Sequence, residues 1–377
     1  MKSLMNSELG MFEQTVVDFA ANELADDRQE NDRPGALPLF EAVLEKAHAV
    51  GFFSVTLPED LNGCDMGTIE LCLMLESISR TDASLAAVIF TDTLAKEIVY
   101  RARGTLLLQE LLSEACDYNN ALFGFPSQAD PSECKALTAA KVAEGVYALD
   151  GTADYVVLGG IARHAVLPAR TSQGEYSFFL VDLSSPGVAL SGPVASLGLH
   201  ACPAADITLE GARGLLVGDE GEGAVYAERV AGRMNAAAAA MSLGVMQGSF
   251  EEAVAYAQER QQGGREIVNW SEVRRMLARM AVKVKVADMV VSQACRAAQE
   301  NLPGWEIGAM AAALFTGEAS IGFTTDGIQV LGGNGYMEDY GQEKRFRDAA
   351  QIRSLLGHAP LRELHLMGKV LGGATLY

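Results

Sequence analysis

The order in which two kinds of periodicity follow one another along the chain constrains the fold most. In the first third, apolar residues recur at helical spacing, as at Phe12, Val16 and Phe19. In the middle third, short β-type runs alternate with glycine and proline. The last third returns to long stretches of helical spacing with few turn residues. This order predicts an α+β protein with an N-terminal helical domain over residues 1–120, an antiparallel β domain over 121–220 and a C-terminal four-helix bundle over 221–377.

The same periodicities predict individual elements. In the first third they predict helices over Ser7–Leu24, Leu39–Val50, Thr68–Ser79, Ser84–Arg101 and Gly104–Cys116. In the middle third they predict strands at Val146–Leu149, Tyr155–Leu158, Ala165–Leu167, Ser177–Val181 and Val188–Leu190, with a turn signal at Asp150-Gly151. In the last third they predict helices over Ala224–Gln262 with a gentle break at Gly244, from Ser271 as a cap, over Trp305–Leu331 and over Arg345–Leu371.

Charge and length exclude several functions. The chain has 377 residues, of which 49% are hydrophobic, so it can bury a sizeable core. Its formal net charge of −20 argues against nucleic acid or an anionic membrane surface as a partner. A polyanionic ligand would need a locally basic pocket. No metal site is predicted.

The six cysteines form no C-x-x-C pair and are too scattered for a disulfide framework. The first residues mix Glu8, Glu13 and Asp18 into their apolar positions, so no signal peptide is expected. No run of 18 apolar residues is present, and no membrane span is predicted. A cytoplasmic location follows as an expectation.

A glycine cluster interrupts the helical texture in DGIQVLGGNGYMEDYGQEKRFRD, residues 326–348. Each glycine costs a helix about 1 kcal/mol, so such a cluster needs a reason. Apolar residues precede it, and densely charged residues of both signs follow it. One interpretation is a helix C-cap followed by a solvated helix. The other is a close approach of the backbone to a ligand or partner.

The full string resembles the C-terminal signature of the acyl-CoA dehydrogenase family. The matching residues are Gln329, Gly332, Gly333, Gly335, Tyr336, Glu343, Lys344, Arg347, Asp348 and Ala349. Gly327 departs from it, since the family usually has alanine there. Weaker likenesses run over nearly the whole chain, among them SLGLHA at 196–201, where His200 replaces the family's usual arginine. The resemblance implies the family's order of helices, β domain and bundle, and FAD-dependent desaturation of an acyl-CoA thioester.

The catalytic base that the resemblance implies is missing. The family's glutamate stands nine residues after the arginine that matches Arg347, and this chain has Leu356 there. The second position that the family uses falls at or near Met234. Neither side chain accepts a proton. Glu228 and His358 are weak substitutes, His358 being more simply a loop histidine and Glu363 a solvated residue.

The flavin-ring cradle is also degenerate. Where the family has T-E-P-x-A-G-S-D, this chain has GFPSQAD at 124–130, which keeps Pro126 but places Ser127 after it. Where the family has W-I-T/S, this chain has Tyr155-Val156-Val157. The valine at 157 has no donor for a flavin.

The residues that in this family reach the adenine and pyrophosphate end of FAD are partly kept. Arg260 could hold a phosphate, although it could also be a cation at a helix C-terminus. Gln329, Gly332 and Gly333 resemble the segment that reaches a neighbouring subunit's FAD. Gly263 replaces a phenylalanine of the family, and Ser271 stands where it has glutamine.

These features favour a non-catalytic subunit of a heteromeric acyl-CoA dehydrogenase. The resemblance implies a homologous catalytic partner in an α2β2 assembly, FAD at the shared interface, a bulky or steroid-derived acyl-CoA and electron-transferring flavoprotein as acceptor. Three alternatives stay open: a self-sufficient dehydrogenase with a displaced base, a flavin-dependent oxygenase or oxidase, and a non-enzymatic structural or binding protein.

Overall fold

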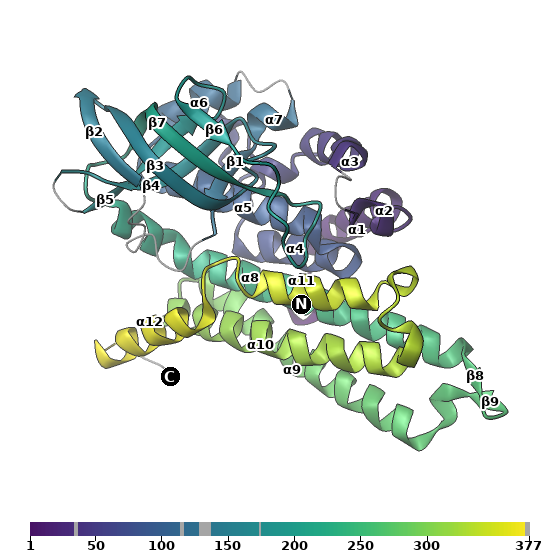
Figure 1. Ribbon diagram of the computed structural model, residues 1–377. Coiled ribbons are helices and arrows are strands. Elements are labelled where there is room, and N and C mark those ends of the chain that lie inside the picture. The colour runs from purple at the N-terminus through teal and green to yellow at the C-terminus, as the bar shows by residue number, and fades with distance from the viewer. Residues whose placement is uncertain (34–36, 114–116, 128–136, 173–174, 374–377) are drawn as a thin grey trace.

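The computed structural model describes residues 1–33, 37–113, 117–127, 137–172 and 175–373 (Figure 1). Helices occupy the chain up to Ala121, strands follow as far as Val217, and the remainder is helical apart from two two-residue strands. Figure 1 shows the sheet at one end of the molecule and the long helices α8, α9 and α10 side by side at the other. The predicted order of helices, sheet and helices is therefore confirmed.

The first set of helices wraps one long buried helix. Its members are α1 (Ser7–Glu23), α2 (Arg28–Asn31), α3 (Leu37–Ala49), α4 (Thr68–Thr81), α5 (Ala83–Arg101), α6 (Thr105–Ser113) and α7 (Tyr118–Ala121). Asn6 caps α1 by accepting from the Leu9 N–H at 2.8 Å. Asp82 caps α5 in the same way, through the Ser84 N–H. Because α5 is buried from Ala83 to Val99, it forms the core of this part of the chain.

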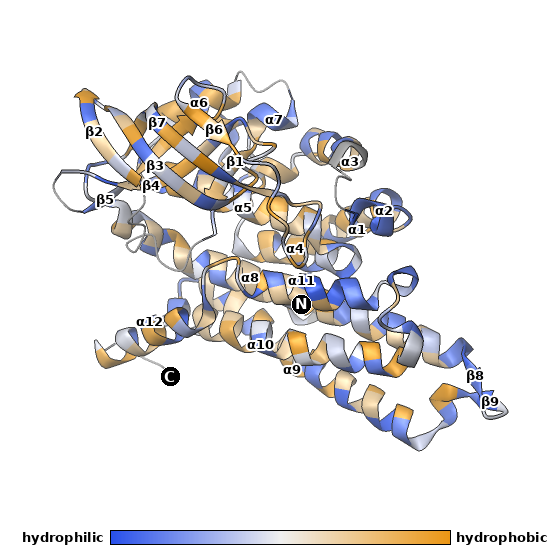
Figure 2. Cartoon of the chain, viewed as in Figure 1, coloured by the Kyte–Doolittle hydropathy of each residue, from blue (hydrophilic) through white to orange (hydrophobic). Residues whose placement is uncertain are grey.

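Within the described residues, seven strands form one sheet. They are β1 (Phe123–Pro126), β2 (Leu137–Ala143), β3 (Val146–Val157), β4 (His164–Arg170), β5 (Tyr176–Asp182), β6 (Val188–Leu190) and β7 (Ala204–Val217), in the order β1-β3-β2-β4-β5-β7-β6. Most pairings are antiparallel, but β4 pairs in parallel with both β1 and β2. The expected purely antiparallel sheet is therefore mixed at this corner. In Figure 2 the strands are largely orange, as expected for a sheet with a buried face.

The sheet differs from the sequence prediction at one expected turn and at one strand that was not predicted. Asp150-Gly151 is not a turn, because β3 continues through it and joins two predicted strands into one. Gly151 has φ +120° and lies at a register shift of β3 against β7, so the glycine marks a β-bulge. The long strand β7 was not predicted, because its alternation is interrupted by Gly211 and Gly214.

The bundle contains α8 (Gly223–Glu259), α9 (Ser271–Gln299), α10 (Trp305–Leu331) and α11 (Gln342–Ile352), with α12 (Ala359–Leu371) at its end. The two-residue strands β8 (Gln261–Gln262) and β9 (Arg265–Glu266) join α8 to the turn before α9. The expected break at Gly244 is absent. A Cβ at Gly244 would lie 2.2 Å from the Glu76 carbonyl oxygen, so this glycine lets α4 approach α8 closely.

Three further differences concern the ends of elements. Ser271 is the first residue of α9, and the capping position is Trp270, which makes no side-chain hydrogen bond there. The segment expected as one closing helix is two helices, α11 and α12. Cys64, Cys72, Cys202 and Cys295 are free thiols, while Cys116 and Cys134 lie outside the described residues.

Helix α10, with the turn after it to Asn334, is long and apolar enough to qualify as a membrane span by length and composition alone. Of its most apolar window, 56% is buried inside the molecule. The helix thus has the burial of a core helix of the bundle, packed on α8, α9 and α11.

Candidate functional site

The position expected to carry a base lies in the turn between α11 and α12. Leu356 is half-buried there and packs against the main hydrophobic core. His358 comes two residues later, is exposed, and precedes α12 without capping it by a side-chain hydrogen bond. The turn therefore presents an apolar side chain inward and its only histidine to solvent.

The facing surface of α8 carries no acid at this level either. Met234 is fully buried, and Asn235 beside it is 3% exposed. Glu228 lies two turns earlier on α8, is exposed, forms an ion pair with Lys369 of α12, and lies 3.8 Å from Nε2 of His365. Glu363, the other carboxylate considered from the sequence, is also exposed, so neither Glu228 nor Glu363 is buried.

Sequence reasoning missed Arg362, the buried cation of this region. It lies on α12 and is 8% exposed, and its Nη2 donates to Oδ1 of Asn235 at 2.6 Å. Burial lowers the pKa of this guanidinium to about 10, and no carboxylate of the described residues pairs with it. The signal was present in the helical period, which places Arg362 on one face with Ala359 and Leu366.

The region that the resemblance assigns to the flavin ring is crossed by direct contacts. The Ser127 hydroxyl donates to the Ser354 carbonyl at 3.0 Å, and the Gln351 amide donates to the Tyr155 hydroxyl at 2.7 Å. The side chain of Val157 is 4% exposed and offers no donor. Pro126 pairs with Val156 in the sheet. Gln128, Ala129 and Asp130 lie outside the described residues.

These contacts do not fit a flavin ring. The polar groups that could face a ring on the sheet side already have partners, since the Ser127 hydroxyl bonds to the turn after α11 and the Tyr155 hydroxyl to Gln351 of α11. A ring inserted between them would have to break both hydrogen bonds, and Val157 could not replace them. No catalytic step through a ring held by this chain is therefore derived.

The far end of the bundle has an open cavity of about 700 Å³. Arg260, Gln329, Gly332 and Gly333 all line it, together with Tyr256 and Trp270. The fold thus brings together Arg260, from the end of α8, and the expected adenine-end residues from the end of α10, which are Gln329, Gly332 and Gly333. Ser271 does not line this cavity, while its neighbours Trp270 and Val273 do.

This cavity suits a phosphate-bearing group. Arg260 is exposed at the end of α8, and its guanidinium makes no hydrogen bond or ion pair with any described residue. Gly332 has φ +59°, a conformation that favours glycine, and a Cβ at Gly332 or Gly333 would meet nothing within 4 Å. The cavity offers a free cation and a bare backbone, which are the groups that bind pyrophosphate.

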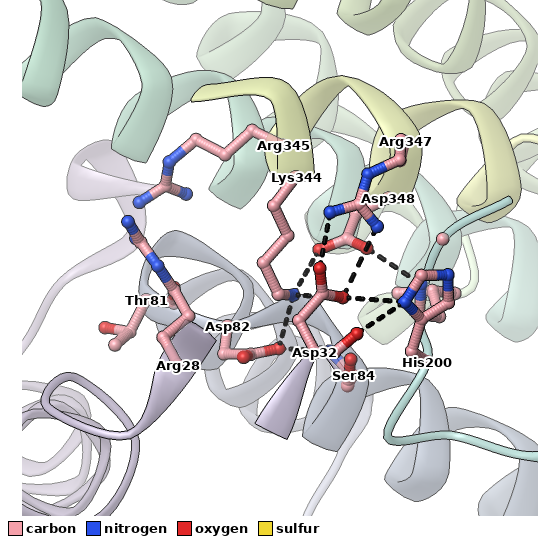
Figure 3. A network of polar contacts seen from close by, with 12 residues as sticks. Arg28, Asp32, Thr81, Asp82, Ser84, His200, Lys344, Arg345, Arg347 and Asp348 are labelled. Atoms are coloured by element: carbon pink, nitrogen blue, oxygen red, sulfur yellow. Dashed lines mark hydrogen bonds and ion pairs between the residues drawn. The ribbon is translucent and has the colours of Figure 1, made fainter. Parts of the chain in front are cut away.

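A buried network, here called the charge clamp, joins three parts of the chain and includes Asp32, Asp82, His200, Lys344, Arg347 and Asp348 (Figure 3). Lys344 Nζ lies 2.7 Å from Asp348 and 3.1 Å from Asp82. Arg347 pairs with Asp32. The charged segment after the glycine cluster is therefore not a solvated helix, because Lys344, Arg345 and Asp348 of α11 are buried.

His200 supplies a positive charge where the family usually has arginine. Its Nδ1 lies 2.6 Å from the carbonyl oxygen of Asp32, and its Nε2 lies 3.0 Å from that of Ser196. Both ring nitrogens thus face acceptors, as a protonated imidazole requires. Hydrogen bonding to Asp32 outweighs burial and raises the pKa of His200 to about 9. Burial would raise the pKa of Asp32, but bonds from His200 and Arg347 hold it at about 2.

Two family descriptions match this chain. "Acyl-CoA dehydrogenase, N-terminal domain" matches residues 6–152, and "Acyl-CoA dehydrogenase, C-terminal domain" matches residues 221–360. The chain is 25% identical to cyclohexane-1-carbonyl-CoA dehydrogenase of Geobacter metallireducens, over 98% of this chain and 99% of that protein. It is also 25% identical to the caffeyl-CoA reductase-Etf complex subunit CarC of Acetobacterium woodii, over 96% and 97%.

The fold agrees with a solved member of the same family. Butyryl-CoA dehydrogenase from Megasphaera elsdenii superposes with a TM-score of 0.87 at 20% identity, over 97% of this chain and 99% of that chain. The match extends over helices, sheet and bundle alike. The chain therefore belongs to the acyl-CoA dehydrogenase family, the oxidoreductases that oxidise acyl-CoA thioesters with FAD.

Proposed function

We propose that this chain is the non-catalytic subunit of a heteromeric FAD-dependent acyl-CoA dehydrogenase. The observation that carries the proposal is Leu356 in the position of the base. On the helix that follows, Arg362 bonds to Asn235 of α8, and neither a cation nor an amide accepts a proton. Removal of an α-proton needs an acceptor, and a positioned base contributes about 10²–10⁴-fold to such a step.

The chain contributes to a shared cofactor from the other end of the molecule. Arg260, with the backbone at Gln329, Gly332 and Gly333, would hold the pyrophosphate end of an FAD whose ring lies in a homologous, base-bearing subunit. FAD supplies the hydride acceptor of the reaction, and this chain's residues supply charge and shape. Two such pairs would form an α2β2 assembly with two FAD molecules.

A cyclic or otherwise bulky acyl group is the proposed substrate. The relative from Geobacter metallireducens is named for a cyclohexane carboxylic thioester, which supports a ring-derived acid. A steroid-derived acyl group belongs to the same class. The relative from Acetobacterium woodii is named as a subunit of a complex with Etf, which supports electron-transferring flavoprotein as the acceptor.

A displaced base in a self-sufficient enzyme receives less support. His358 is exposed, and Glu228 is held by Lys369 on the solvent side of α12. Neither lies among the buried residues around Asn235. A double variant, His358→Gln with Glu228→Gln, tests this alternative directly. If the lone chain turns over substrate and the double variant does not, a displaced base is established.

The test compares the chain purified alone with the chain co-purified with a base-bearing homologue. Visible absorbance gives the flavin content, and dye-linked oxidation of cyclohexane-1-carbonyl-CoA gives activity. We expect no bound flavin and no turnover in the lone chain, and one FAD for every two chains in the complex. A lone chain that binds one FAD and oxidises the thioester at a normal rate contradicts the proposal.

A matched pair of variants tests the cofactor end. Arg260→Gln removes the free guanidinium of the open cavity and is expected to lower the FAD content of the complex at least tenfold at limiting FAD. Arg279→Gln removes an exposed arginine of α9 that does not line the cavity, and is expected to change nothing. Equal flavin retention in both complexes would show that this chain does not hold the cofactor.

A further inference from the structure

A second cavity, here called the seam cavity, lies where the N-terminal helices meet the bundle. It encloses about 320 Å³ between the start of α4, the end of α5, the first turns of α8 and the connection from α9 to α10. Three arginines line it: Arg101 from α5, and Arg229 and Arg233 from α8. Three neighbouring arginines form a local concentration of positive charge, which is unexpected in a chain of net charge −20.

One carboxylate, Glu97, pairs with two of the three guanidinium groups. Arg233 Nη1 lies 2.5 Å from Oε1 of Glu97, and Arg101 Nε lies 3.2 Å from Oε2 of the same side chain. Arg229 has no carboxylate partner among the described residues, and its Nη1 donates to the carbonyl oxygen of Arg101 at 3.2 Å. Three arginines against one glutamate leave two positive charges in excess at the cavity wall.

The backbone adds to the positive potential. Helix α4 begins at the cavity, and its Thr68 N–H donates to Oε1 of Gln299 at 2.6 Å. A Cβ at Gly67 would lie 2.2 Å from the Gln299 side chain, so glycine at the capping position is what admits this amide. The positive end of the α4 dipole thus faces the same space as the arginines, with the Gly67 N–H donating to Oε2 of Glu70 at 3.0 Å and the Thr68 N–H to Gln299.

The seam cavity has more donors than acceptors. The amide NH₂ of Gln299 and the indole N–H of Trp305 make no hydrogen bond within the part of the chain that the structure describes. The main acceptor on the wall, Glu97, is already shared by two arginines. A cavity of this kind is complementary to a ligand that only accepts hydrogen bonds and carries negative charge.

We infer that the seam cavity binds a phosphate monoester. A phosphate monoester near pH 7 carries about two negative charges, which match the excess of two, and its oxygens are acceptors for guanidinium, amide and indole N–H groups. A carboxylate would neutralise one charge only. The volume leaves space beside the phosphate for a small organic group against the Trp305 ring.

The seam cavity is separate from the Arg362–Asn235 pair and from the open cavity around Arg260. On α8, Arg233 and Asn235 are two residues apart, so their side chains point about 200° apart around the helix axis. Asn235 faces Arg362, while Arg233 faces Glu97. Because its wall comes from α4, α5, α8 and the α9–α10 connection, a bound phosphate ester joins the N-terminal helices to the bundle and stabilises the folded chain. This inference does not depend on which subunit is catalytic.

The test uses the full chain and AMP and inorganic phosphate as probes, at constant ionic strength set with chloride. Isothermal titration calorimetry gives affinity, and thermal denaturation gives the shift in midpoint. We expect saturable binding of AMP and of phosphate, a raised midpoint, and no effect of acetate at equal ionic strength. No binding of either probe at millimolar concentration, or an equal response to acetate, overturns the inference.

Arg229→Gln is the decisive variant, because Arg229 is exposed and does not hold Glu97. It is expected to weaken both probes at least tenfold. Arg274→Gln is the control, since Arg274 is an exposed helix arginine that also donates to a backbone carbonyl, that of Val268 at 3.0 Å. Equal weakening by both variants, or by neither, assigns any binding to general surface charge and contradicts a site at the seam cavity.

Discussion

Nη2 of Arg362 lies 2.6 Å from Oδ1 of Asn235, and this is the only hydrogen bond of that buried guanidinium with a described residue. The next pair along the same two helices, Lys369 and Glu228, has opposite charges and is exposed. The buried Arg362 therefore pairs with a neutral amide, where a carboxylate would have reduced the cost of burying its charge.

The Arg362–Asn235 pair gives a prediction with opposite signs for its two members. Arg362→Met removes the uncompensated charge and is expected to leave the free energy of unfolding unchanged or raise it by about 1–4 kcal/mol. Asn235→Leu leaves the guanidinium without its acceptor and is expected to cost about 3–5 kcal/mol. Urea unfolding measures both. The double variant should recover the stability of Arg362→Met, and a double variant as unstable as Asn235→Leu would contradict this account of the pair.

The His200–Asp32 contact predicts a loss of stability in weak alkali. The pKa of His200 is raised from 6.5 to about 9, so its contribution is fully present below pH 6.5 and is lost as pH rises through 9. The groups that face it are Asp32 and Arg347, and both keep their charge over this range. Thermal unfolding between pH 6 and 10 measures the slope.

His200→Arg is the control for this titration. An arginine keeps the positive charge beside Asp32 over the whole interval. The decline in midpoint between pH 6.5 and 9 should therefore become shallower in the variant. An unchanged slope would assign the decline to other groups.

Lys344 is expected to be the most costly lysine to remove. It is 3% exposed, and burial would lower its pKa, but the charges of Asp348, Asp82 and Asp32 raise the pKa instead. Lys344→Met leaves these carboxylates without a shared cation and is expected to cost about 3–5 kcal/mol. Lys141→Met, at an exposed pair with Glu144, is the control and is expected to cost at most about 1 kcal/mol. Equal midpoints in guanidinium chloride would refute the difference.

Two helix glycines separate close packing from intrinsic helix propensity. Gly244→Ala places a Cβ 2.2 Å from the Glu76 carbonyl oxygen and is expected to destabilise by about 1–3 kcal/mol or more. Gly322 of α10 has nothing within 4 Å of its Cβ position. Gly322→Ala is therefore expected to stabilise by about 1 kcal/mol. Urea unfolding distinguishes these signs, and a gain in stability at Gly244 would exclude the close approach of α4 and α8.

Much of the fold could be predicted because local period and tertiary packing agree. Helix α10 begins and ends at the predicted residues, and β6 does so as well. Strand β7 was missed because its glycines remove the alternation that marks a strand. At Asp150-Gly151 the sequence indicated a turn, but pairing on both sides of β3 keeps the strand extended through a bulge.

The candidate site was only partly predictable. The prediction that the base is missing rests on Leu356 alone and stays a prediction, because it uses the identity of one position in a strong motif. Arg362 could not be found in this way, since burial of an arginine depends on the packing of α12 against α8. The buried state of α11 was also hidden, because its counter-ions Asp32 and Asp82 stand far away in the sequence.

The charge clamp draws on residues near positions 32, 200 and 344, each in a different third of the chain. Within the charge clamp, Asp32 and Asp82 of the first third and His200 of the middle third find their partners of opposite charge in another third of the chain. A partly docked chain would therefore bury charged side chains without their partners, which costs desolvation free energy. The ion pairs of this junction are complete only when all three thirds are docked. We therefore expect the three thirds to unfold together rather than one after another.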